Sequence, residues 1–284
     1  MRASAIGHPL ISNGSQTTTE RAGDLLPGPD RLIEVRDVVK KFGNVEALKG
    51  VSLHVRKGEI VGLLGPNASG KTTLLKLIMG FMRPDSGQVR VLGRDPFEDP
   101  GVRAEVGYVP EEVLLYDSLT VREFLYFLGR MRKIDPNTYM DRARVLTTVF
   151  EMEDKLECLI GSLSRGDRQR LAIISALLHE PTVLVLDEPI MGLDPVAARV
   201  FKEIAVGMKE KGKGILMSTH VLELAEALCD RIYLLHEGQI VAKGDVRAVR
   251  KALGEDKSLE DVFIKLTEKD EVLKKVIRVL REEF

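Results

Sequence analysis

The chain has 284 residues, of which 44% are hydrophobic, and its 42 basic residues nearly balance its 43 acidic residues. This length allows one large domain or two modest ones with a packed core, and the small net charge gives no overall field for nucleic acid. Cys158 and Cys229 are too few and too far apart for a metal motif or a disulfide framework. The sequence has no apolar run of membrane-spanning length and no signal-peptide core, so we expect a cytosolic chain without a nucleic-acid partner.

The N-terminal part of the chain changes character near residue 32. Residues 1–31 are rich in Ser, Thr, Gly and Asn, which predicts a disordered extension that buries little apolar surface. Alternating hydrophobic residues from Leu32 and again from Val51 predict two half-buried antiparallel strands. A further strand is expected from Gln88, after the turn at residues 84–87.

A phosphate-binding pattern lies between the second and third of these strands. Residues 65–72, GPNASGKT, fit G-x-x-x-x-G-K-[ST], with a predicted buried strand at 59–64 before them and a helix at 73–79 after them. Such a loop aims backbone N–H groups at phosphate oxygens, its lysine reaches the β- and γ-phosphates, and its threonine hydroxyl can bind Mg²⁺. A glycine turn with a solvated lysine would not require the full pattern. We therefore expect a nucleoside triphosphate to contact Gly65, Pro66, Asn67, Ala68, Ser69, Gly70, Lys71, Thr72 and Thr73.

The middle of the chain is predicted to be helical. Thr120 and Glu123 have the spacing of a capping box, and the Asp135-Pro136 pair favours the start of a second helix. Ser164 can cap a third helix. The pattern therefore predicts a helical insert in a strand-rich chain.

Strand and helix alternate again in the last third. Residues 183–186 and 214–217 are continuous apolar runs, as expected for parallel strands that are buried on both faces. A helix is expected from Val221 to Leu228 and a hairpin over residues 231–242, and the sequence beyond Gly244 has a helical pattern.

Two acidic residues directly follow the apolar run at 183–186. Asp187 and Glu188 should therefore emerge at the carboxyl edge of the sheet, where open α/β sheets bind their ligands. Asp187 suits the binding of Mg²⁺, and Glu188 suits a general base that activates water. Alone, the pair would be interpreted as two surface acids, but the phosphate loop favours the catalytic interpretation.

Several further motifs carry a family resemblance. Residues 162–170, SLSRGDRQR, resemble the signature of ATP-binding cassette (ABC) proteins, whose usual core is LSGGQ. Residues 192–195, GLDP, resemble the loop that follows the magnesium aspartate in that family, and His220 resembles its switch histidine. Phe42 stands where the family has an aromatic residue that stacks on adenine, and Glu111 stands where it usually has a glutamine. From about residue 32 to 244, the chain resembles the ATP-binding subunits of ABC transporters, with every motif in family order. Residues 258–267 resemble the C-terminal segment of cassettes from export-type ABC systems.

The resemblance implies an α/β fold with a P-loop (RecA-like), mostly parallel core sheet, an antiparallel β subdomain and an α-helical subdomain. The cassette would cover residues 32–244, with its helical subdomain at about 112–178, and a helical C-terminal extension would cover 245–284. Two cassettes would bind ATP and Mg²⁺ between them in a head-to-tail dimer. One cassette would supply the catalytic residues Glu188, His220 and Lys71. The same cassette would bind the metal through Thr72, Glu111 and Asp187. The other cassette would contact the nucleotide in trans through Ser164 and Gly166.

Three positions depart from the family pattern. Arg165 replaces the first signature glycine, Asp167 replaces the signature glutamine, and Glu111 replaces the loop glutamine. Asp167 adds a negative charge near a polyphosphate, and Glu111 can bind metal through oxygen but has no amide to donate.

The resemblance favours an ATPase subunit that energises a membrane transporter, with the export direction favoured by the signature variants and the C-terminal segment. Its partners would be a second cassette and a permease on a separate chain, which would hold it at the inner face of the cell membrane. The alternative is a soluble ABC ATPase for assembly or remodelling, such as an iron–sulfur assembly factor. A P-loop kinase or GTPase would leave the signature unexplained. The apolar run 113–116 is either a permease-docking surface or part of the core.

Overall fold

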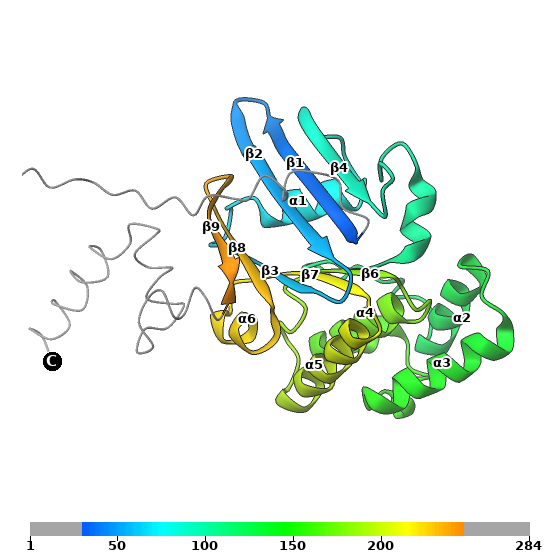
Figure 1. Ribbon diagram of the computed structural model, residues 1–284. Helices are drawn as coiled ribbons and strands as arrows, with labels where there is room; N and C mark the ends of the chain where they lie inside the picture. Colours follow the sequence, from blue (N-terminus) through cyan, green and yellow to red (C-terminus); the bar gives the residue numbers. More distant parts are fainter. Residues whose placement is uncertain (1–29, 247–284) are drawn as a thin grey trace, which may run out of the picture.

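The computed structural model describes residues 30–246, so nearly all of the two predicted extensions, 1–31 and 245–284, lies outside the described residues. Two sheets and the helices around them form this part of the chain (Figure 1). The strands are β1 (Arg31–Phe42), β2 (Val45–Arg56), β3 (Ile60–Leu64), β4 (Ser86–Val91), β5 (Val106–Val109), β6 (Val183–Asp187), β7 (Gly214–Thr219), β8 (Arg231–His236) and β9 (Gln239–Asp245). The α-helices are α1 (Lys71–Ile78), α2 (Val121–Met131), α3 (Pro136–Val149), α4 (Arg165–Leu177), α5 (Pro195–Glu210) and α6 (Leu222–Leu228).

The larger sheet has six strands in the order β5-β6-β7-β3-β8-β9. Its pairings are parallel except for β8 with β9, which form an antiparallel hairpin. The predicted strands at 59–64, 183–186 and 214–217 lie side by side in its centre, with β3 between β7 and β8. The prediction of a mostly parallel core sheet is therefore confirmed.

Both faces of the larger sheet are buried. Successive residues of β6 alternate between two hydrophobic clusters: Val183 and Val185 belong to one, and Leu184 and Leu186 to the other. The first cluster includes α1 and the smaller sheet, and the second includes α2 to α6. This burial explains why the strands consist of continuous apolar runs instead of alternating ones.

The smaller sheet is antiparallel, in the order β2-β1-β4, and it packs across α1 on the core sheet (Figure 1). It is the predicted antiparallel subdomain, although its strands are longer than the patterning indicates. β4 begins at Ser86, before the predicted Gln88, because Ser86 still pairs with Val39 of β1.

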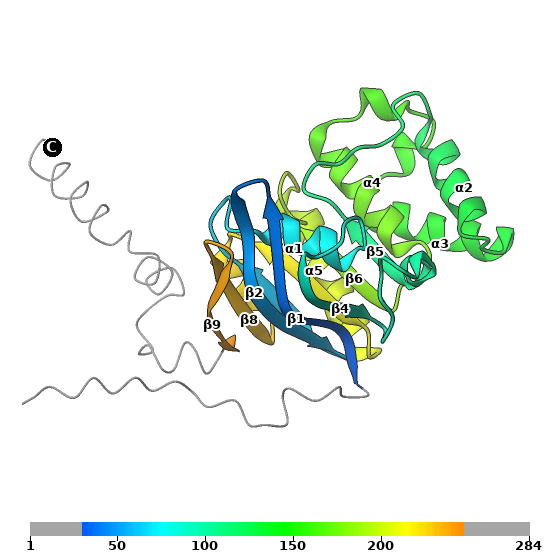
Figure 2. The ribbon, with the colours of Figure 1, turned by 90° about the horizontal axis from the view of Figure 1, so that it is seen from above.

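The helices α2, α3 and α4 form a group at one end of the molecule, as the view from above shows (Figure 2). Their starts follow from local sequence. Thr120 and Glu123 make both hydrogen bonds of the predicted capping box, Asp135 caps α3 ahead of a proline, and Ser164 accepts a hydrogen bond from the Asp167 backbone at 3.1 Å. All three predicted helices are confirmed.

Helix α5 was not predicted from the sequence. The signal was present, because the Asp194 carboxylate accepts hydrogen bonds from the backbone of Val196 and Ala197, and Pro195 occupies the first helical position. These hydrogen bonds and one from the Arg170 side chain lower the pKa of Asp194 to about 2.

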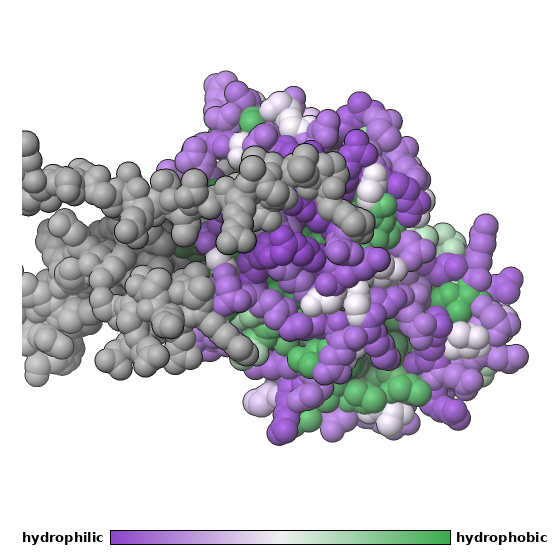
Figure 3. All heavy atoms as spheres, viewed as in Figure 1, coloured by the Kyte–Doolittle hydropathy of each residue, from purple (hydrophilic) through white to green (hydrophobic). Residues whose placement is uncertain are grey.

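Most of the surface in Figure 3 is hydrophilic, and hydrophobic residues gather at the lower edge of that view, near α3 and α5. Within residues 30–246, none of the helices combines the length and the apolar character that a membrane crossing requires.

Candidate nucleotide site

The phosphate loop connects β3 to α1, as predicted. Its two outer glycines are required by close backbone approaches: a Cβ on Gly65 would lie 2.3 Å from the Leu235 carbonyl oxygen, and one on Gly70 would lie 2.7 Å from that of Ala47. Gly70 also has a φ of 109°, and Ala68 adopts a left-handed φ of 64°. The loop therefore curls tightly at the start of α1, where backbone N–H groups lack partners within the helix.

Lys71, the first residue of α1, folds back over this loop. Its Nζ donates to the carbonyl oxygens of Gly65 at 2.8 Å and Pro66 at 3.1 Å, and the residue is 7% exposed. Burial lowers the pKa of Lys71, an effect that the nearby carboxylates of Glu188, Asp187 and Glu111 oppose. The charge of the lysine is thus held between the loop and a group of acids.

Asp187 ends β6 and is fully enclosed, with 1% of its surface exposed. One oxygen, Oδ1, accepts a hydrogen bond from the Ser218 hydroxyl of the neighbouring strand β7. The other, Oδ2, is buried and has no hydrogen-bond partner among residues 30–246. A buried carboxylate oxygen without a donor is costly unless a cation or another polar group meets it, so Asp187 fits a metal-binding role.

Glu188 and His220 meet at the carboxyl ends of β6 and β7. The His220 Nδ1 lies 2.9 Å from Glu188 Oε1, and the Glu188 backbone N–H donates to the side chain and carbonyl of Ser218, each at 3.2 Å. Glu188 has a φ of 50°, a conformation uncommon outside glycine. Strained residues of this kind are concentrated at functional sites, which agrees with the predicted role of Glu188.

Much of the phosphate loop and the two acids after β6 line one cavity of about 370 Å³. Its lining residues are Ala47, Asn67, Ala68, Ser69, Gly70, Lys71, Thr72, Thr73, Glu111, Asp187 and Glu188, so the predicted residues Gly65, Pro66 and His220 are not in this set. The Thr72 hydroxyl lies 3.5 Å from Glu111 Oε2. Among the described residues, no group of three or more His, Cys, Asp or Glu side chains could hold a metal by itself. An Mg²⁺ that takes a hydroxyl, one or two carboxylates and phosphate oxygens would fit this donor set.

The structure does not bring every predicted residue to this cavity. Ser164 and Gly166 lie at the start of α4, outside the set that lines it. Phe42 is also outside that set, at the end of β1, with half of its surface exposed and Lys40 Nζ 5.7 Å from its ring centroid. A single chain therefore holds the phosphate loop and the acids around one cavity, and Ser164 and Gly166 are not among the residues that line it.

The residues of the signature make hydrogen bonds within the chain. The Ser164 hydroxyl donates to the Asp167 carboxylate at 2.7 Å. Arg170 contacts Asp194 at the start of α5 and also donates to the Phe150 carbonyl at 3.2 Å. Arg165 lies beside Gly192, where a Cβ would be 3.7 Å from the Arg165 Cγ.

From the sequence alone, Ser218 and Thr219 are both interpreted as local caps, and for Ser218 the structure shows a different role. Thr219 makes a local hydrogen bond, as its hydroxyl accepts from the Val221 N–H at 3.0 Å, but the N-cap residue of α6 is Val221. Ser218 instead holds Asp187 and the Glu188 backbone. The missing information was strand register, since Asp187 and Ser218 are paired partners on adjacent parallel strands.

A phosphate loop followed by two carboxylates at the edge of a parallel sheet defines a P-loop nucleotide-binding protein. Residues 48–191 match the family model described as ABC transporter. The chain is 35% identical to the ABC-type transporter ATP-binding protein EcsA of Bacillus subtilis (strain 168) over 241 residues, which cover 84% of this chain and 98% of that protein. It is 39% identical to the Nod factor export ATP-binding protein I of Burkholderia lata over 222 residues, covering 78% of this chain and 73% of that one.

Solved structures agree. The ATP-binding subunit of an ABC transporter superposes with a TM-score of 0.78 at 34% identity, covering 83% of this chain and 99% of that one. A dimeric bacterial ABC transporter cassette superposes with a TM-score of 0.69 at 27% identity, covering 76% and 99%. The chain belongs to the ABC transporter family, as an ATP-binding subunit with ATPase activity coupled to transport.

Proposed function

We propose that this chain energises a membrane exporter as a head-to-tail dimer that binds Mg²⁺-ATP at two shared sites. The observation that carries the proposal is the separation of Ser164 and Gly166 from the cavity that holds Lys71 and Glu188. A two-fold dimer would complete two such sites with one interface, because the same surface is used twice. The similarity to a dimeric cassette supports this arrangement.

In the proposed mechanism, Lys71 and the backbone of the phosphate loop bind the β- and γ-phosphates. Glu188 takes a proton from the attacking water, while His220 orients the Glu188 carboxylate through its Nδ1 contact of 2.9 Å. Thr72, Asp187 and Glu111 would hold Mg²⁺, which neutralises phosphate charge when bound. Phe42 would contact the adenine, and hydrolysis would separate the two cassettes because ATP is bound by both.

An exposed apolar patch formed by Leu114, Tyr116 and Phe127 is the proposed docking surface for a separate permease. Leu114 is 80% exposed and Tyr116 is 57% exposed, so solvent contacts apolar side chains there. The Tyr116 ring lies edge-on to the Phe127 ring, with the centroids 5.7 Å apart, so these two residues of the patch are in contact. Through that partner the chain would lie at the inner face of the cell membrane.

The export direction rests on likeness alone. The Nod factor export protein is one of the similar chains, and the signature departures are those on which the sequence resemblance to export-type cassettes depends.

The Glu188→Gln variant tests the shared site. It keeps the size and shape of the side chain but removes the base, so ATP turnover should fall by about 10²–10⁴. We expect the variant to form a dimer that persists on size exclusion with Mg²⁺-ATP and dissociates without it. The control is Glu223→Gln, an exposed acid on α6, which should hydrolyse ATP at the native rate.

Each result has a distinct meaning. If Glu188→Gln hydrolyses ATP at the native rate, Glu188 is not the general base. An inactive variant that remains monomeric with Mg²⁺-ATP would contradict the shared site. Co-purification of the native chain with soluble partners alone would contradict the transporter assignment and favour the assembly or remodelling alternative.

A further inference from the structure

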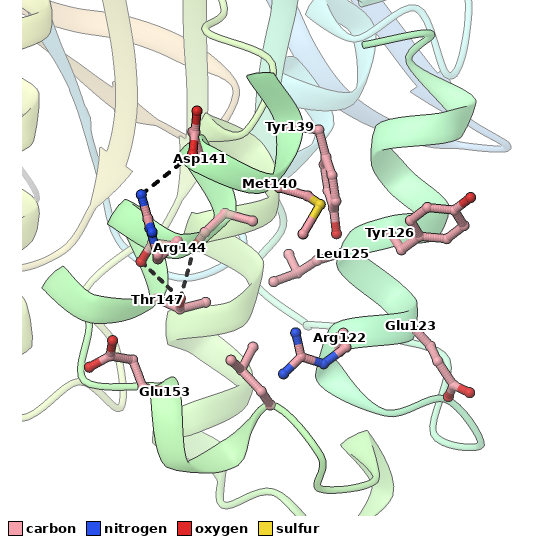
Figure 4. A pocket seen from close by; sticks show the side chains of 12 residues that line it. Arg122, Glu123, Leu125, Tyr126, Tyr139, Met140, Asp141, Arg144, Thr147 and Glu153 are labelled. Atoms are coloured by element: carbon pink, nitrogen blue, oxygen red, sulfur yellow. Dashed lines mark hydrogen bonds and ion pairs between the residues drawn. The ribbon is translucent and has the colours of Figure 1, made fainter. Parts of the chain in front are cut away.

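A second cavity, of about 560 Å³, opens between α2 and α3 (Figure 4). It shares no lining residue with the nucleotide cavity. Its apolar walls are Leu125, Tyr126, Tyr139, Met140, Ala143 and Leu156. The size and the apolar lining are those of small-molecule pockets, which measure about 300–1,000 Å³.

The charged residues around this cavity are paired within the chain. The Arg122 Nε donates to Glu157 at 2.6 Å, and Arg144 pairs with Asp141 at 3.5 Å. The carboxylates of Glu123 and Glu153 accept hydrogen bonds from threonines, at 2.8 Å from the Thr120 backbone and at 2.7 Å from the Thr148 hydroxyl. An ionic ligand would have to displace these partners, so the cavity favours an uncharged one.

One polar group inside the cavity is available. Figure 4 shows the Tyr139 hydroxyl directed into the space between Met140 and Tyr126. Tyr139 is 7% exposed, and its hydroxyl makes no hydrogen bond with the residues that the structure describes. Burial raises the pKa of Tyr139 to about 12, so the phenol keeps its proton and can donate it.

The position of the Tyr139 ring depends on Gly129 of α2. A Cβ on Gly129 would lie 2.3 Å from the Tyr139 Cδ2, so only glycine leaves room for the ring. Glycine is less favourable than alanine inside a helix, and Gly129 does not have a positive φ that would explain its presence. The Tyr126 ring meets Tyr139 edge-on, with a centroid distance of 6.2 Å. The wall of the cavity is therefore formed before any ligand arrives.

We propose that this cavity binds an uncharged, mainly apolar small molecule that accepts one hydrogen bond from the Tyr139 hydroxyl. The apolar walls supply the binding energy by burying the ligand's surface, and the single phenol selects molecules with a suitably placed carbonyl or ether oxygen. Because the site uses no residue of the nucleotide cavity, the proposal does not depend on the proposed dimer.

The test uses the full chain and prodan, an uncharged naphthalene ketone whose fluorescence reports an apolar environment. Prodan should bind saturably, and 2-acetylnaphthalene should displace it roughly twofold to tenfold more strongly than 2-ethylnaphthalene, which lacks the acceptor. Tyr139→Phe should make the two competitors equal. Ala143→Trp, which fills the cavity, should abolish binding, whereas Val145→Trp on the exposed side of α3 should not.

Four results would overturn the proposal. The first is that prodan does not bind saturably, and the second is that it still binds to a folded Ala143→Trp variant. The third is that the difference in affinity between the two competitors is the same in Tyr139→Phe as in the native chain. The fourth is that Ala143→Trp loses self-association or a membrane partner. The last would make the cavity a protein interface. Tyr139→Phe removes a single oxygen, so its comparison remains decisive if Ala143→Trp does not fold.

Discussion

Lys71 is the residue on which nucleotide affinity should depend most directly. In the structure its ammonium group binds the carbonyl oxygens of Gly65 and Pro66, so it is already positioned over the loop. Lys71→Ala removes a charge-assisted contact worth about 1.5–3 kcal/mol, which corresponds to roughly a tenfold to hundredfold weaker affinity. ATP titration by calorimetry measures this change.

The matched control is Lys76→Ala, which removes an exposed lysine from the same helix. Its ATP affinity should equal that of the native chain. Equal affinities of Lys71→Ala and the native chain would exclude Lys71 from the phosphate site.

At the scale of elements, His179 connects the end of α4 to β5. Its Nε2 lies 3.1 Å from the Val106 carbonyl oxygen, and burial, with a smaller contribution from Arg132, lowers the pKa of His179 from 6.5 to about 4. Between these pH values the unfolded chain binds a proton that the folded chain does not. The contribution of neutral, buried His179 to the free energy of unfolding is therefore complete above pH 6.5 and is lost as the pH falls toward 4.

His179→Gln should reduce that pH dependence, because glutamine can still donate to Val106 but does not titrate. Urea unfolding measures the free energy of unfolding at pH 7 and at pH 5. The decrease between these two pH values should be about 1 kcal/mol smaller in the variant than in the native chain, allowing for partial solvent screening. Equal losses in the two proteins would contradict the assignment of the low pKa to His179.

Much of the element pattern could be predicted from the sequence, because it depends on local chemistry. The phosphate loop, the caps at Thr120 and Ser164 and the apolar parallel strands are all coded by neighbouring residues. The position of Ser218 beside Asp187 could not be predicted, because it depends on the register between two strands, and the two residues are 31 positions apart in the chain. The pairing of Arg170 with Asp194 likewise needs the packing of α4 against the start of α5.

At the scale of the whole molecule, the run 113–116 shows what folding adds to a sequence pattern. Val113 and Leu115 pack against the core, whereas Leu114 and Tyr116 are exposed, so the core interpretation holds for the first two residues and only the last two are left for the proposed docking surface. Leu114→Asp should therefore abolish co-purification with a membrane protein while basal ATPase activity stays within about twofold, since surface substitutions of this kind rarely disturb the fold.

Val145→Asp, an exposed apolar residue on α3 outside the patch, is the control and should keep the membrane partner. Retention of the partner by Leu114→Asp would place the docking surface elsewhere. Leu115→Asp is expected to lose stability instead, because it would bury a charge against the core.

The contact between Gly129 and Tyr139 has a consequence for the evolution of such chains. Since a Cβ at position 129 would collide with the ring at position 139, the two positions are free to change only together. Lineages that keep a large aromatic residue at 139 should retain glycine at 129, and those with a small residue at 139 should accept alanine there. Covariation of this pair across related sequences would then mark which of them inherit the cavity between α2 and α3.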